Sequence, residues 1–393
     1  EPRRSLYPGP HGLDEVMAEW RGGKHGRNVV LDRVVDGSEA RTAPIPETMA
    51  AGVQRALGMR GIKALYDHQA HSFQLVSEGK DVVIATPTAS GKSLCYNLPI
   101  LNRFAEDPEA RAIYLFPTKA LSRDQEESLR GLMTEAGVAH GAITYDGDTP
   151  ADARRVAKQR AGVLITNPDM LHSGILPHHT NWARLFANLR YVVIDELHMY
   201  RGVFGSHLAN VVRRLRRIAH FHGADPVFVL ASATIGNPAE HAARIIGRPV
   251  TCINQSGAPS GPRHVLVYNP PIVNEELGLR ASYQKTVVKL TAELVRAGVP
   301  TLVFGQSRTG VEVMLKYLRD ALSEDPIDRG AIMAYRGGYL PDRRRAIERD
   351  LRAGKIRCVV ATSALELGID IGALDAVVCA SYPGSIAGLW QRF

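Results

Sequence analysis

Short apolar runs alternate with helix-like patterns along most of the chain, and this alternation restricts the fold more than any other feature. The runs cover residues 81–85, 112–116, 163–166, 191–194 and 227–230, then 301–304, 331–334, 358–361 and 376–379. Near-continuous apolar runs of this length are typical of parallel strands that helices cover on both faces. The sequence therefore predicts an α/β fold with two successive doubly wound units, each built on a parallel sheet.

Changes in composition divide the chain into four segments. The first 45 residues are rich in glycine, proline and arginine and show little periodicity, which indicates a loosely packed N-terminal arm. Residues 46–255 contain the first set of strands. A stretch rich in proline and glycine then predicts a linker over residues 256–284, and residues 285–393 contain the second set.

The chain has a formal net charge of +8. An excess of positive charge favours a polyanionic partner, because neutralising phosphates releases their condensed counterions. Charge alone fits a basic protein without such a partner equally well. The motifs have to decide between these two interpretations.

Membrane and disulfide signals are weak. No run of about 18 apolar residues appears, so we expect no membrane span, and the N-terminus lacks the apolar stretch of a signal peptide. The four cysteines (Cys95, Cys252, Cys358 and Cys379) form no CxxC pair. This argues against a disulfide framework or a zinc site in the chain and predicts a cytoplasmic protein.

A phosphate-binding loop is predicted directly after the strand that ends at Ala85. The segment Thr86–Ser93 reads Thr-Pro-Thr-Ala-Ser-Gly-Lys-Ser and runs into a helical pattern, although a strict P-loop has glycine or alanine where Thr86 stands. Its small residues would let backbone N–H groups surround the β- and γ-phosphates of a nucleotide, helped by the helix dipole. These residues are Thr88, Ala89, Ser90 and Gly91.

Two side chains of this loop have further expected roles. Lys92 would place its positive charge on the phosphates, and the hydroxyl of Ser93 would bind Mg²⁺.

An acidic pair follows the strand at 191–194. We expect Asp195 to hold Mg²⁺ and Glu196 to orient and deprotonate the attacking water. His198 would sense the γ-phosphate. Acidic residues also favour the start of an ordinary helix, where the dipole attracts negative charge. The presence of Lys92 and its loop favours the catalytic interpretation.

Beyond these two motifs, the chain resembles the DEAD/DEAH-like superfamily 2 helicases. Seven blocks occur in the expected order. They are Gln69, Pro117–Leu121 (motif Ia), Thr166–Asp169 (Ib), Asp195–His198 (II), Ser232–Thr234 (III), Phe304–Arg308 (IV) and Ala361–Asp370 (V).

The resemblance implies two tandem RecA-like domains and an ATP-dependent DNA helicase or translocase that needs ATP, Mg²⁺ and single-stranded or forked DNA. It implies that Gln69 reads the adenine, that Gly368 and Asp370 complete the ATP site, and that Ser232 and Thr234 couple hydrolysis to movement. The implied contacts to the phosphates of the strand are Thr118, Lys119, Asn167, Arg308 and Thr362.

Four sequence segments resemble the RecQ-related MrfA/SftH type of these helicases. They are Thr88–Ser93, Ser232–Pro238, Leu365–Gly372 and Tyr382–Ala387. That type implies 3′-to-5′ movement and a role in genome maintenance or repair, and the Lhr type is the alternative. In the family, motif VI starts near Gln391 and carries an arginine finger. The sequence stops at Phe393, so we expect the second RecA-like domain to be incomplete.

Several alternatives stay open at this point. An RNA-remodelling enzyme has the same motifs, and a non-catalytic nucleic-acid clamp would keep the same fold. Two basic clusters, Arg213–Arg217 and Arg343–Arg345, lie in helical patterns, where they either grip nucleic acid or form solvated faces. The sequence does not give the oligomeric state.

Overall fold

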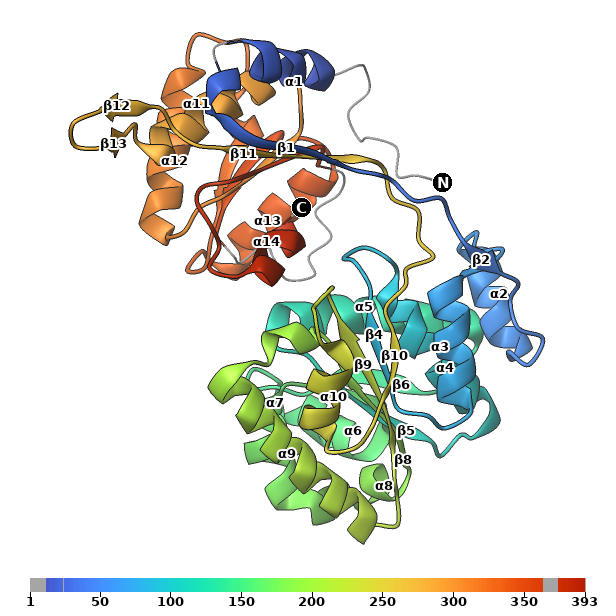
Figure 1. Cartoon of the computed structure of the whole chain (residues 1–393). Helices are drawn as coiled ribbons and strands as arrows, with labels where there is room; N and C mark the ends of the chain where they lie inside the picture. Colours follow the sequence, from blue (N-terminus) through green and yellow to red (C-terminus); the bar gives the residue numbers. More distant parts are fainter. Residues whose placement is uncertain (1–11, 24, 363–373, 393) are drawn as a thin grey trace. The chain divides into compact units, whose positions relative to one another are not determined.

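The computed structural model describes residues 12–23, 25–362 and 374–392, and its chain divides into two compact units (Figure 1). One unit comprises residues 39–259. The other combines the residues before 39 with those from 260 onward. Both units are built on parallel sheets, which confirms the predicted fold class.

A seven-stranded sheet forms the centre of the unit at 39–259. Its order is β10-β4-β9-β8-β5-β7-β6, and every neighbouring pair is parallel. The carboxyl ends of all seven strands therefore lie at one edge. The strands are β4 (Val82–Ala85), β5 (Arg111–Leu115), β6 (Gly141–Thr144), β7 (Ala161–Thr166), β8 (Leu189–Ile194), β9 (Val227–Ser232) and β10 (Thr251–Ile253).

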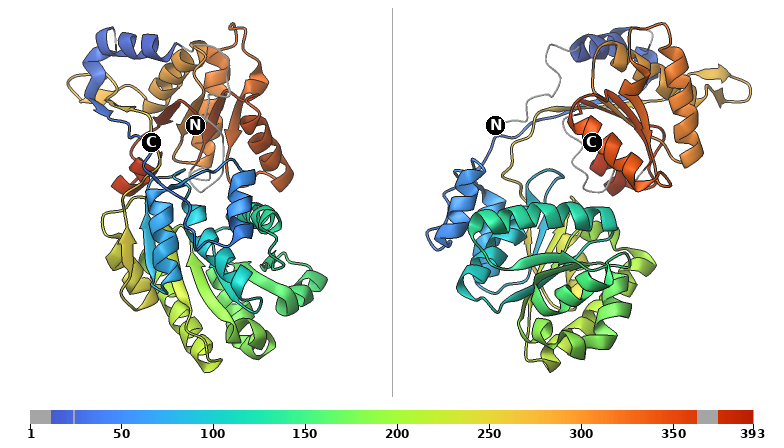
Figure 2. Two further views of the ribbon diagram at one scale, coloured as in Figure 1. Left: turned by 90° about the vertical axis from the view of Figure 1, so that its right-hand side faces the viewer. Right: turned by 180° about the vertical axis from the view of Figure 1, so that it is seen from behind.

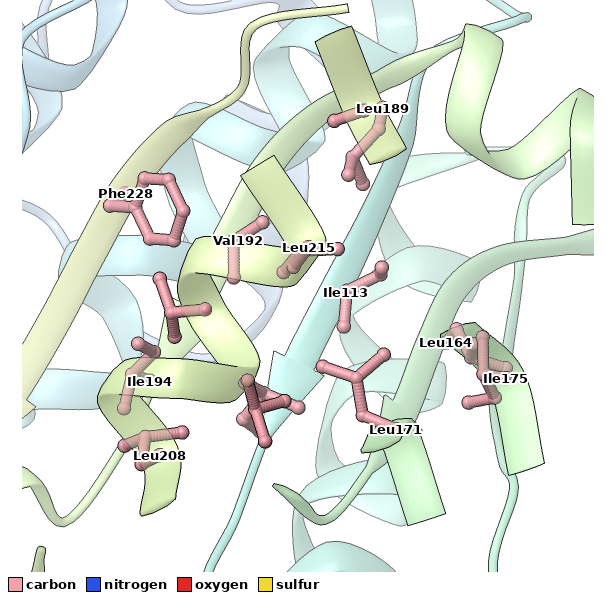
Figure 3. Close-up of a cluster of buried hydrophobic side chains, with 14 of the residues drawn as sticks. Ile113, Leu164, Leu171, Ile175, Leu189, Val192, Ile194, Leu208, Leu215 and Phe228 are labelled. Carbon is pink, nitrogen blue, oxygen red and sulfur yellow. The ribbon is translucent and has the colours of Figure 1, made fainter. Parts of the chain in front are cut away.

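Helices cover both faces of this sheet. Val192 and Ile194 of β8 belong to a buried cluster with Leu215 of helix α9 (Figure 3). On the other face, Tyr114 of β5 donates its hydroxyl hydrogen to Asn97 of helix α4 at 2.8 Å. The helices are α2 (Ala51–Met59), α3 (Asp67–Ser77), α4 (Lys92–Glu106), α5 (Lys119–Ala136), α6 (Ala151–Arg160), α7 (Pro168–Met170), α8 (Ala183–Ala187), α9 (Gly202–Phe221) and α10 (Pro238–Ile246).

The second unit contains a four-stranded parallel sheet in the order β15-β16-β14-β17. Its strands are β14 (Thr301–Phe304), β15 (Ile332–Tyr335), β16 (Cys358–Ala361) and β17 (Ala376–Cys379). Its helices include α11 (Tyr283–Arg296), α12 (Arg308–Ala321), α13 (Pro341–Arg352) and α14 (Ile386–Arg392). All of the apolar runs that the sequence singles out form strands of the two sheets, within one or two residues at each end.

Residues 13–23 and 25–35 do not form the loosely packed arm that the sequence predicts. Helix α1 (Leu13–Gly22) places Val16 in a buried cluster with Leu294 and Val299 of the second unit. Strand β1 (Val29–Val35) then pairs antiparallel with β11 (Arg263–Tyr268), as Figure 1 and Figure 2 show.

The expected linker at 256–284 is likewise partly strand, since it contains β11 and the hairpin of β12 (Ile272–Asn274) and β13 (Leu279–Arg280). Strands β1 and β11 stabilise each other through backbone hydrogen bonds between segments far apart in the sequence. The pattern of either segment alone does not reveal such a pairing.

None of the helices in the described ranges combines the length and the apolar character that crossing a membrane would require.

We predict that Val16→Asp will release the N-terminal segment from the second unit. The variant would bury an unpaired carboxylate against Leu294 and Val299, at a cost on the order of 3 kcal/mol. Trypsin cleavage after Arg21 and Arg27, followed by mass spectrometry, should become several-fold faster. Ala18→Asp, on the exposed face of the same helix, is the matched control. Equal cleavage rates in the two variants would show that α1 is not packed as described.

Candidate active site

The loop between β4 and α4 has a strained backbone. Ala89 (φ 62°) and Gly91 (φ 77°) are both in the left-handed region, which costs a non-glycine residue about 1 kcal/mol. A Cβ atom at Gly91 would lie 2.6 Å from Nε2 of Gln69, so a larger residue would displace the Gln69 amide in addition to straining the backbone. Thr88 and Ala89 are exposed at the tip of the loop. Strain of this kind is typical of loops whose backbone is shaped for a ligand.

Internal hydrogen bonds hold the loop in this shape. The hydroxyls of Thr86 and Ser90 lie 2.7 Å apart and are buried, which explains a threonine at the first position. The Lys92 ammonium donates to the carbonyls of Thr86 (3.0 Å) and Pro87 (2.8 Å). Ser93 is half-buried in the first turn of α4, whose N-terminus has no side-chain cap. Uncapped first-turn N–H groups next to a lysine form a good environment for an anion.

The acidic pair follows β8 at the same edge of the sheet. Asp195 is buried, and its Oδ1 accepts a hydrogen bond from the Glu196 N–H at 2.7 Å. Its Oδ2 accepts from the hydroxyl of Tyr96 at 3.0 Å. Glu196 has a left-handed backbone (φ 52°), which turns the chain sharply after the strand. The aspartate is therefore held on both oxygens before any ligand arrives.

The charges of the loop and of the acidic pair act on one another. Burial, and then the negative charge of Asp195, together raise the pKa of Glu196 to about 8 against the opposing positive charge of Lys92. Burial also raises the pKa of Asp195 and lowers that of Lys92. The structure thus brings together the lysine and the two carboxyl groups that the sequence places more than a hundred residues apart.

His198 connects the acidic pair to the segment after β9. Its Nε2 lies 3.4 Å from Oε2 of Glu196, and its Nδ1 accepts the Ala233 N–H at 3.1 Å. Burial, followed by the charge of Lys92, lowers the pKa of His198 to about 4. The ring is therefore neutral at physiological pH, and its proton is on Nε2. Of the neighbouring residues, Ser232 is buried and Thr234 is exposed.

Gln69 is part of the loop's support. Its side-chain oxygen accepts the Tyr66 N–H at 3.0 Å, and its Nε2 donates to the Gly91 carbonyl at 3.1 Å. Both ends of the buried amide are thus bonded within the protein. An adenine contact by Gln69 would have to replace or share these bonds.

Two residues of the site were missed by the sequence analysis. His68 has its Nε2 2.9 Å from the Ser90 carbonyl, and its Nδ1 accepts the Gly257 N–H at 3.1 Å. Burial lowers the pKa of His68, so the ring is neutral and ties the loop to residue 257. Tyr96 is the other. The available signals were that His68 adjoins Gln69 and that Tyr96 lies one helical turn after Lys92.

Three of the expected strand-binding residues lie at the same edge, after β5 and β7. Thr118 accepts the Leu121 N–H at 3.4 Å and caps helix α5, while Asn167 accepts the Met170 N–H at 2.8 Å and caps α7. Lys119 is exposed and forms a 2.7 Å ion pair with Asp148. Phosphate binding by Lys119 would have to compete with this ion pair.

The remaining expected residues belong to the second unit. Arg308 is exposed at the start of α12, shortly after β14. Thr362 directly follows β16 and donates its N–H to the Tyr335 carbonyl at 3.2 Å. Because β14 and β16 are parallel neighbours, Arg308 and Thr362 come from one edge of their sheet. Gly368 and Asp370 lie outside the described residues.

Comparison with known proteins agrees with these motifs. The DEAD/DEAH box helicase domain matches residues 66–242, and the helicase conserved C-terminal domain matches residues 284–393. The ATP-dependent helicase YprA of Bacillus subtilis, described as uncharacterized, is 50% identical over 97% of this chain and 50% of its own length. The chain thus spans about half the length of this relative.

Solved structures give the same result. The DUF1998 helicase MrfA bound to DNA and AMPPNP matches with a TM-score of 0.92 and 49% identity, over 97% of this chain and 52% of MrfA. The Mycobacterium smegmatis helicase Lhr bound to ssDNA and AMP-PNP matches with a TM-score of 0.69 and 27% identity, over 89% of this chain and 46% of Lhr. The domain matches identify a superfamily 2 helicase. Within that class, the chain belongs to the MrfA/YprA type, which confirms the resemblance seen in its motifs.

We predict that His68→Phe will destabilise the unit at 39–259. The ring would still pack, but the Ser90 carbonyl and the Gly257 N–H would lose their partners, at a cost of about 2 to 4 kcal/mol in the free energy of unfolding. Urea denaturation measures this loss, and His71→Phe on the exposed side of the same helix is the control. Faster hydrogen exchange at the Gly257 amide should accompany it. An unchanged free energy of unfolding would contradict the hydrogen-bonded role of His68.

Proposed function

We propose that this chain is the ATP-driven motor of a DNA helicase or translocase. The observation that carries the proposal is the convergence of Lys92, Asp195 and Glu196 at one sheet edge beside an uncapped helix N-terminus. The relative MrfA, which is described as bound to DNA and AMPPNP, supports the choice of ATP and DNA.

ATP would bind with its phosphates at the loop between β4 and α4. The backbone of Thr88–Gly91 would surround the phosphates, and Lys92 would exchange its carbonyl partners for phosphate oxygens. Gln69 is the proposed adenine contact. Gly368 and Asp370, which belong to the second unit's part of the sequence, are proposed as additional contacts to ATP.

The site also suits Mg²⁺. Asp195 is buried and Glu196 is half-buried, both have raised pKa values, and both face one lysine, so this part of the site lacks positive charge. Ser93 and Asp195 would hold the ion, which is bound in such sites by few protein groups together with phosphate and water. Among the described residues, no group of three or more acidic, histidine or cysteine side chains could hold a metal ion without other ligands. This is consistent with an ion that takes most of its ligands from phosphate and water. When bound, Mg²⁺ would neutralise charge on the phosphates.

Glu196 and His198 would share the work of hydrolysis. Glu196 would accept a proton from the attacking water, and its raised pKa suits a base that works near neutral pH. Neutral His198 can donate from Nε2 to Glu196 while Nδ1 remains bonded to Ala233. A movement or a change of protonation at Glu196 would thereby affect the segment Ser232–Thr234, which is the proposed coupling element.

DNA would be held through its backbone, with contacts that do not depend on sequence. The proposed contacts are Thr118, Lys119, Asn167, Arg308 and Thr362. The 3′-to-5′ direction and the role in genome maintenance enter this proposal from the resemblance to the MrfA/SftH type. A cytoplasmic location is proposed because all four cysteines are unpaired thiols.

ATP hydrolysis tests the proposal most simply. We expect single-stranded DNA to stimulate it, and RNA of the same length to stimulate it much less. Glu196→Gln should retain binding of a fluorescent ATP analogue but lower kcat by about 10² to 10⁴ fold, because it removes a general base. Glu127→Gln, on the exposed side of α5, is the control.

Normal ATP turnover by the Glu196→Gln variant would show that Glu196 is not the general base. Stimulation by RNA alone would favour the RNA-remodelling alternative. Binding of ATP and DNA without any hydrolysis by a wild-type protein that includes the arginine finger of motif VI would favour a non-catalytic clamp.

A second prediction concerns Tyr96 as a positioning residue. Tyr96→Phe keeps the ring but leaves Oδ2 of Asp195 without its hydroxyl donor. We expect the Mg²⁺ concentration needed for half-maximal binding of a fluorescent ATP analogue to rise by about tenfold, as for other groups that orient a metal ligand. Tyr114→Phe is the matched control, because its ring contacts Tyr96 but its hydroxyl bonds Asn97. An equal change in the two variants would mean that Tyr96 acts only through packing.

A further inference from the structure

Helix α9 carries one of the two arginine clusters that the sequence left unassigned. Six of its residues recur at intervals of three or four and therefore lie on one face of the helix. We call them the α9 basic stripe: His207, Asn210, Arg213, Arg214, Arg217 and His220. Leu208 and Leu215, on the opposite face, are buried in the core.

The positive charge of the stripe is not balanced within the helix. Helix α9 contains no aspartate or glutamate in its 20 residues. In the described part of the chain, Arg213 bonds the side chain of Asn210 (3.0 Å) and Arg214 bonds the His172 carbonyl (3.3 Å), and neither these two arginines nor Arg217 pairs with a carboxylate. Like charges one turn apart repel, so the arrangement costs stability unless an anion compensates it.

The other cluster, on α13, is different. That helix contains Asp342, Glu348 and Asp350 among its arginines. Arg345 forms an ion pair with Asp342, and Arg349 lies 3.9 Å from Asp350. Three carboxylates thus partly compensate the five arginines of α13 within the helix itself, which suits a solvated face, and we assign no partner to it.

A surface hollow of about 810 Å³ lies along the α9 basic stripe, and His172 also lines it. Val211 is its one apolar lining residue among those described, and the one carboxylate there, Asp225, is engaged by Arg248 at 2.9 Å. A protein partner normally requires an apolar centre in its interface. A positively charged hollow lined mainly by arginine and histidine side chains instead suits a chain of phosphates.

The stripe begins beside the expected strand-binding edge. Nε2 of His207 lies 3.3 Å from Oδ1 of Asp169, two residues after Asn167 (α7 and α9 in Figure 1). Helix α9 starts after the carboxyl end of β8 and leads to the start of β9, so the stripe runs from this edge toward the opposite one. From His207 to His220 it is about 20 Å long, at 1.5 Å per residue.

We propose that the α9 basic stripe binds the phosphate backbone of a single DNA strand and extends the site at Thr118 and Asn167 down the side of the unit. This inference rests on the proposed DNA-binding function. Arg213, Arg214 and Arg217 supply the charge, and the histidines at the two ends donate hydrogen bonds. The stripe reads no bases, so it adds affinity without sequence preference.

Fluorescence anisotropy with labelled oligothymidine strands of about 6 and about 16 nucleotides tests this proposal, since sites of this class cover roughly that range. Arg213→Ala/Arg217→Ala should bind the short strand like the wild type and the long strand about tenfold more weakly. The slope of log affinity against log salt on the long strand should become shallower by about 1.4, from two lost contacts. Arg213→Lys/Arg217→Lys should restore most of the loss.

The control, Arg155→Ala/Arg244→Ala, removes the same charge from exposed positions on α6 and α10, where each arginine pairs with its own helix's carboxylate. It should match the wild type on both strands. A stripe variant that binds the long strand as tightly as the wild type overturns the proposal, as does an equal loss on both strands. If the stripe variant loses affinity only for duplex DNA, the proposal that the stripe binds a single strand is wrong. A wild type that binds neither strand contradicts the proposed DNA-binding function itself.

Discussion

Two carboxyl groups beside one lysine, that of Asp195 buried and that of Glu196 half-buried, form the interaction on which the rest of the site depends. Asp195 and Glu196 follow β8, Lys92 follows β4, and strand β9 lies between these two strands. A parallel sheet brings the ends of all three strands to one edge, so the fold itself concentrates the charge. Burial raises the pKa of both acids because a single ammonium group cannot fully compensate them. The arrangement is therefore ready for a further cation and a polyphosphate.

Two neutral histidines connect this charged centre to the surrounding chain. His198 bonds the segment after β9, and His68 bonds the loop to residue 257, close to the point where the chain leaves the unit. In both rings Nδ1 accepts a backbone N–H, so the proton is on Nε2 and faces the site. Any shift of the loop or of Glu196 on binding and hydrolysis must therefore also disturb these two backbone segments. In the proposed function, such bonds would provide a physical basis for converting hydrolysis into movement.

The sequence predicted the parts that local patterns encode. The apolar runs became strands, and the loop at Lys92 and the acidic pair fell at strand ends, since their spacing relative to each strand is a short-range property. Strands β1 and β11 were not foreseen, because each becomes a strand only through a partner far away in the sequence. The roles of His68 and Tyr96 in the site were also missed, since a buried histidine or tyrosine gives no signal of what its polar atoms will bond. Gln69 was singled out, but its bonds to Tyr66 and Gly91 depend on the final packing.

The most direct measurement is a crystal structure of the protein with a non-hydrolysable ATP analogue and Mn²⁺, whose anomalous signal locates the metal. The account predicts one strong peak beside Asp195 and Ser93, with the Lys92 ammonium moved from the Thr86 and Pro87 carbonyls to the phosphates. A metal peak away from Asp195, or phosphates bound elsewhere while Lys92 keeps its carbonyl partners, would contradict the account.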